Sequence, residues 1–103
     1  MTLRSWGFTL EMCHTWTIAR GVAAGGDKDA KILFVELTDR DGVVGIGEAA
    51  PTGRYLESEA GAAAFFESVD AGALSFEDVA SSMEYVDSVA PGEHAAKGAL
   101  NIA

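Results

Sequence analysis

The fold is decided by residues 31–51, which read KILFVELTDRDGVVGIGEAAP. Side chains in the first part of this stretch alternate between two faces, one carrying Leu33, Val35 and Leu37 and the other Ile32, Phe34 and Glu36. Residues 39–42 supply a turn, because an Asp-Gly pair between two β-branched runs lets glycine take a positive φ without steric cost. Residues 43–48 then run back. The stretch therefore predicts an antiparallel hairpin.

Working outward, residues 2–16 are rich in aromatic residues, Thr and Leu and alternate like a strand, with Phe8, Leu10 and Met12 on one side. Residues 20–29 carry three glycines and four charged residues without apolar periodicity, which is typical of a loop. We therefore predict an antiparallel meander of three strands.

Helical character begins after Pro51. The alanine-rich segment 58–71 predicts a first helix, and 76–86 predicts a second, with Ser75 as N-cap and Asp78 completing a capping box. A third helix is expected to follow Pro91 and to run to the end of the sequence. The fold class is thus α+β, a three-stranded meander followed by a small bundle of about three helices.

The third helix carries an apolar stripe formed by Ala96, Ala99, Leu100 and Ala103. Nothing in the sequence is obviously left to cover this stripe, so we expect it to face a further domain. The helix also has no C-cap signal, and natural domains seldom end on an uncapped apolar turn. We therefore expect residues 1–103 to be one domain of a longer protein, in a chain that frays after Glu93 and self-associates when isolated.

Charge and composition exclude several classes of function. The 103 residues carry a net charge of -9, and the seven Lys and Arg residues are scattered, so the sequence argues against nucleic acid and anionic membranes as partners. The single cysteine, Cys13, cannot form an internal disulfide, which favours a reducing compartment. Without an apolar run long enough for a signal peptide or a membrane span, a cytoplasmic location is expected.

A family resemblance is carried by Val35-Glu36-Leu37, by residues 41–51 with their Gly-Ile-Gly-Glu-Ala-Ala-Pro signature, and by Arg54-Tyr55-Leu56-Glu57. These residues resemble the N-terminal capping domain of the muconate-lactonizing and mandelate-racemase-like enzymes of the enolase superfamily. Residues 14–21, HTWTIARG, are similar to the L-Ala-D/L-Glu (dipeptide) epimerase branch, and residues 95–103 resemble the helix that leads into the barrel.

The resemblance implies a two-part enzyme in which this domain closes over a (β/α) barrel that is absent from residues 1–103. In such enzymes two barrel lysines exchange a proton at the carbon α to a carboxylate, and barrel acids hold Mg²⁺, which stabilises the enediolate. We assign no catalytic residue and no metal ligand within this sequence, and we expect the isolated chain to be inactive.

The resemblance also implies that residues 17–29 and 50–57 form two loops that select a small dipeptide-like substrate. Within the first loop, Arg20 could pair with a substrate carboxylate or remain a solvated charge at the end of a strand. In the second, Arg54 and Tyr55 could face the substrate, although Arg54 could equally pair with a neighbouring glutamate. Trp16 and Ile18 are candidates for the pocket wall, with a place in the core as their alternative.

Other readings of the sequence stay open. The parent could be another muconate-cycloisomerase or N-acyl amino acid racemase type of enzyme, because the barrel residues that separate these reactions are not encoded here. The chain could also be a stand-alone α+β binding module or a defunct remnant. The barrel of the same parent chain is the expected partner, and a homo-oligomeric parent is left open.

Overall fold

The computed structural model describes residues 1–11, 17–18, 21–22, 29–51 and 57–103. Three strands form the main sheet in the order β1-β4-β5, with β1 spanning Thr2–Glu11, β4 spanning Asp29–Thr38 and β5 spanning Val44–Ala49. All pairs are antiparallel, so the predicted meander is confirmed. Residues 12–16, the rest of the predicted first strand, lie outside the described residues. Two short strands, β2 (Thr17–Ile18) and β3 (Gly21–Val22), lie between β1 and β4 in the sequence and pair with each other in a separate sheet. The sequence predicted a loop from residue 20 onward.

The hairpin between β4 and β5 follows the predicted turn chemistry. The Asp39 carboxylate accepts hydrogen bonds from the backbone N–H groups of Asp41 and Val43, both at 2.9 Å. Gly42 takes φ +82, a left-handed conformation that glycine adopts without steric cost. The Asp-Gly signal in the sequence thus located this turn correctly.

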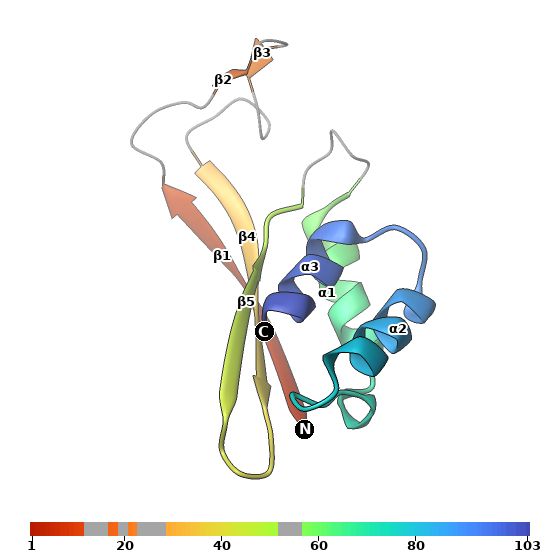
Figure 1. The fold of residues 1–103 in the computed structure, drawn as a ribbon. Helices are drawn as coiled ribbons and strands as arrows, with labels where there is room; N and C mark the ends of the chain where they lie inside the picture. Colours follow the sequence, from red (N-terminus) through yellow and green to blue (C-terminus); the bar gives the residue numbers. More distant parts are fainter. Residues whose placement is uncertain (12–16, 19–20, 23–28, 52–56) are drawn as a thin grey trace.

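Three α-helices cover one face of the main sheet (Figure 1). They are α1 (Glu59–Ser68), α2 (Val79–Val89) and α3 (His94–Ile102), with a short 3-10 turn, η3 (Ala71–Ala73), between the first two. The Ser58 side chain caps α1 by accepting from the Gly61 N–H, as expected for a serine at this position. The predicted α+β architecture is confirmed.

The start of α2 differs from the prediction. The helix begins at Val79, and its N-cap is Asp78, whose carboxylate accepts from the Ser81 N–H at 3.1 Å. Ser75 and Ser82 instead hydrogen bond to each other, since the Ser75 N–H donates to Ser82 Oγ at 2.9 Å. The capping box predicted at Ser75 was wrong because the acid placed at N3 is itself the better cap.

The core lies between the helices and the inner face of the main sheet. Its buried residues include Leu33, Val35, Leu37, Ala49, Ala62, Phe65, Phe66, Val86, Ala96, Ala99 and Leu100. The inner face of β4 is therefore the one carrying Leu33, Val35 and Leu37. On its opposite, outer face Phe34 and Glu36 are partly exposed, whereas Ile32 is buried outside this core cluster.

The apolar stripe of α3 is covered from within the chain, which corrects the expectation drawn from sequence. Ala96, Ala99 and Leu100 are at most 5% exposed because α3 lies directly on β5. A Cβ added at Gly47 would lie 1.9 Å from the Ala99 carbonyl oxygen, and one at Gly45 equally close to that of Ala103. The glycines of the Gly-Ile-Gly signature thus let a helix approach the strand backbone, and the expected fraying of α3 loses its basis.

Candidate functional site

The two segments expected to select a substrate are attached to the same end of the main sheet. Glu11, the last residue of β1, pairs with Asp29, the first of β4, so the segment between them leaves and returns at this end. β5 also runs toward this end before the chain reaches Pro51, whereas the 39–43 turn lies at the opposite end (Figure 1). The topology therefore roots both segments on one side of the domain.

The structure describes only part of the predicted site. Ile18 lies in β2, where its backbone pairs with Gly21. Trp16, Arg20, Arg54 and Tyr55 lie outside the described residues. Their roles in substrate selection remain predictions.

Two glutamates link the start of α1 to the start of α3, and sequence reasoning missed this arrangement. Glu57, just before α1, accepts a hydrogen bond from the Ala95 N–H in the first turn of α3, with Oε1 2.9 Å from the nitrogen. Glu93, the N-cap of α3, makes no side-chain cap of its own helix and takes a left-handed φ of 51. Its Oε1 lies against Gly61 in the first turn of α1.

The two glutamates affect both the electrostatics of the helix N-termini and the position of the 50–57 segment. Each carboxylate lies near the N-terminus of the other segment's helix, where the helix dipole and unpaired N–H groups favour negative charge. Glu57 also closes the 50–57 segment, so its bond to Ala95 fixes where that segment rejoins the folded domain. A sequence signal was available in the acids before both helices, although it did not reveal that Glu57 hydrogen bonds to α3 rather than to the helix that follows it.

Groups suited to proton transfer or metal binding do not converge in the described part of the chain. No set of three or more His, Cys, Asp or Glu side chains there could hold a metal ion. Lys31 pairs with Thr9 in the sheet, whereas Lys97 lies on α3 with its Nζ 4.0 Å from Asp87. Glu48 is exposed on the outer face of β5. Within the same residues, no helix is long and apolar enough to cross a membrane.

The sequence has a clear relative. No protein-family model matches the chain. The L-Ala-D/L-amino acid epimerase of Pedosphaera parvula is 50% identical over 103 residues, a match that covers 100% of this chain and 29% of the epimerase. The chain is similar to this epimerase along its whole length, and it spans less than a third of the length of that relative.

Solved structures confirm the fold. The substrate-liganded L-Ala-D/L-Glu epimerase of Bacillus subtilis matches this chain with a TM-score of 0.84 at 20% identity, covering 100% of this chain and 29% of that one. A dipeptide epimerase of Cytophaga hutchinsonii, complexed with Mg and the dipeptide D-Ala-L-Val, matches with a TM-score of 0.83 at 23% identity, covering 98% and 27%. At such identities the likeness concerns the fold, and it agrees with the predicted α+β architecture.

Proposed function

We propose that residues 1–103 are the substrate-selecting capping domain of a dipeptide epimerase, an enzyme that moves a proton at the carbon α to a carboxylate. The observation that carries this proposal is the 50% identity, over every residue of the chain, to an L-Ala-D/L-amino acid epimerase that is more than three times as long. The (β/α) barrel and its proton-transferring lysines would then lie in the residues that follow position 103.

The fold supports a division of labour between the two parts. The domain roots the 12–28 and 50–56 segments at one end of a sheet whose inner face is built into the core. Loops on a rigid scaffold are where recognition residues are commonly found. In this proposal Arg20, Arg54, Tyr55, Trp16 and Ile18 contact the substrate side chain and exclude water, while no bond is made or broken by a residue of this chain.

Magnesium would belong to the rest of the enzyme. The described residues offer no cluster of acids that fits the ion, so we derive no step through it here. Mg²⁺ bound elsewhere would stabilise the negative charge of an enediolate. The partners expected of this domain are accordingly the barrel of its own chain and a dipeptide-like substrate.

The proposal is tested by isotope exchange. Full-length protein, with Mg²⁺ in D₂O, should incorporate deuterium at the α-carbon of the glutamate residue in L-Ala-L-Glu, and the isolated 103-residue chain should not. A full-length protein that exchanges no dipeptide but turns over N-acyl amino acids or muconate would assign it to another branch. If the gene ends at codon 103, a stand-alone binding module becomes the better interpretation.

The role of Arg20 has a separate test in the full-length enzyme. Arg20→Met should lower kcat/KM for L-Ala-L-Glu by about ten- to a hundredfold, the effect of losing a charge-assisted hydrogen bond to the substrate carboxylate. The value for L-Ala-L-Leu should change little. Equal losses for both dipeptides would assign Arg20 to structure.

A further inference from the structure

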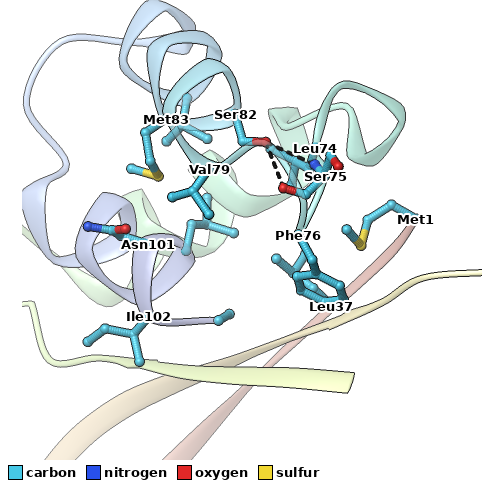
Figure 2. Close-up of a pocket in the computed structure, with 13 residues that line it drawn as sticks. Met1, Leu37, Leu74, Ser75, Phe76, Val79, Ser82, Met83, Asn101 and Ile102 are labelled. Atoms are coloured by element: carbon cyan, nitrogen blue, oxygen red, sulfur yellow. Dashed lines mark hydrogen bonds between the residues drawn. The ribbon is translucent and has the colours of Figure 1, made fainter. Parts of the chain in front are cut away.

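An apolar pocket lies at the end of the domain away from the 12–28 and 50–56 segments. It has a volume of about 270 Å³ and is walled by α2, by the C-terminal end of α3, by the 74–76 segment and by Met1 and Leu37 (Figure 2). Val79 and Ile102 stand at its edge and are 51% and 76% exposed. We name this feature the α2-α3 pocket.

The chemistry of the α2-α3 pocket suits an apolar side chain. Its lining has no charged side chain, and the Ser82 hydroxyl is already bonded to the backbone oxygens of Ser75 and Asp78. Its volume is below the usual range of pockets for small-molecule ligands and cofactors. Met1 and Met83 in the lining are flexible, polarizable side chains that adapt to the shape of an inserted group.

We propose that the residues immediately following position 103 in the full-length protein fill the α2-α3 pocket with an apolar side chain and so fix this domain to the next. Asn101, Ile102 and Ala103 themselves line the pocket, so a chain that continues from α3 starts at its wall. The matched epimerase has 71% of its length outside the region aligned with this chain, which provides the residues required. The inference rests on the proposed two-part enzyme.

A second copy of the domain is a less suitable occupant. Each copy carries a net charge of -9, and pairing two such surfaces brings like charges together. An intramolecular segment meets no comparable cost, because its attachment to α3 keeps it close to the pocket at any protein concentration.

Thiol labelling tests the proposal without relying on activity. Val79→Cys is made in a Cys13→Ser background, both in the 103-residue chain and in the full-length protein, and modification by a maleimide is followed by peptide mass spectrometry. Ala80→Cys is the matched control, since Ala80 is exposed on the same helix but does not line the pocket. Val79 is half exposed, so a cysteine is accommodated there in either protein.

The expected result is labelling of position 79 about tenfold slower or more in the full-length protein, as for a site that reacts only after local opening, with position 80 changed less than about twofold. Equal rates at position 79 in both proteins would overturn the proposal, as would equal protection of position 80.

Protection that grows with the concentration of the 103-residue chain would assign the pocket to a second copy. Protection at 79 in an enzyme that fails the isotope test would refute only the proposed function, whereas an active enzyme without protection would refute only the docking.

Discussion

The two faces of β5 carry side chains of opposite character along one strand. On the inner face, Gly45, Gly47 and Ala49 leave room for α3 to lie on the strand backbone. On the outer face, Val44 and Ile46 are 52% and 53% exposed. The smallest residues of the strand are therefore in its tightest contact, and the largest are near solvent.

The difference between the two faces of β5 shows that the size of a side chain does not indicate how much the residue contributes to packing. A methyl group added to the inner face meets backbone atoms, which cannot rotate away, whereas outer side chains can be shortened with little loss. The outer face does contain contacts of its own, since the ring of Trp6 lies 5.7 Å from that of Phe34 and Arg4 lies over the Trp6 ring. The following changes test whether the two faces differ in stability as much as in packing.

The largest effect is expected from Phe66→Ala in the isolated chain. Phe66 is 1% exposed in the core, so its loss should lower the free energy of unfolding by about 3 to 5 kcal/mol through lost burial and a residual cavity. Phe8→Ala on the outer face removes the same side chain at 50% exposure and should cost less than about 1.5 kcal/mol. Urea unfolding measures both, and similar losses would show that the outer face is also part of the core.

Gly47→Ala should cost about 3 kcal/mol, at the upper end for overpacking, because its Cβ would meet the Ala99 carbonyl oxygen. Amide exchange of α3 should accelerate with it, since the helix must move away from β5. In the unmodified chain, Ala99 should exchange about as slowly as Val35. Ile46→Ala, one residue away on the outer face, should leave the exchange of α3 unchanged, and rapid exchange of α3 before any substitution would contradict the packing described here.

Glu57→Ala removes the contact between the 50–57 segment and α3, and we expect a loss of about 1 to 1.5 kcal/mol from an unpaired N–H at a helix N-terminus. Glu57→Gln keeps an acceptor oxygen and should recover part of this loss. The control is Glu67→Ala, at an exposed position late in α1. Thermal unfolding compares the three, and an equal effect of Glu67→Ala would indicate that only net charge matters.

The smallest effect is expected at the outer ion pair. Arg4 Nη2 lies 3.7 Å from Glu36 Oε2, and the Arg4 side chain is 69% exposed. Arg4→Met should therefore lower stability by only about 0.5 kcal/mol, and this difference should shrink at high salt as screening weakens the pair. A loss that exceeds that of Glu57→Ala would place the more important electrostatic contact on the outer face.

Local sequence signals predicted most elements because the determinants lie within a few residues of one another. The Asp-Gly turn at residue 42 and the alternation along β4 were each located correctly. The start of α2 was misplaced by three residues, since both Ser75 and Asp78 are acceptable caps and the hydrogen bond from Ser75 to Ser82 favours the later start. Of the candidate site, only the backbone of Ile18 lies among the described residues.

The sequence by itself determined the fold class and the resemblance to epimerases, because hydrophobic periodicity, turn residues and a sequence signature are all legible along the chain. Only the tertiary structure decided what covers the stripe of α3. Ala96, Ala99 and Leu100 of this stripe are buried in the core with apolar residues of the sheet and of the other helices, and the backbone of α3 at Ala99 and Ala103 lies against Gly47 and Gly45. A strand position that receives a helix on glycine carries no apolar side chain to mark the contact in the sequence, so the place of α3 cannot be recognised until the chain is folded.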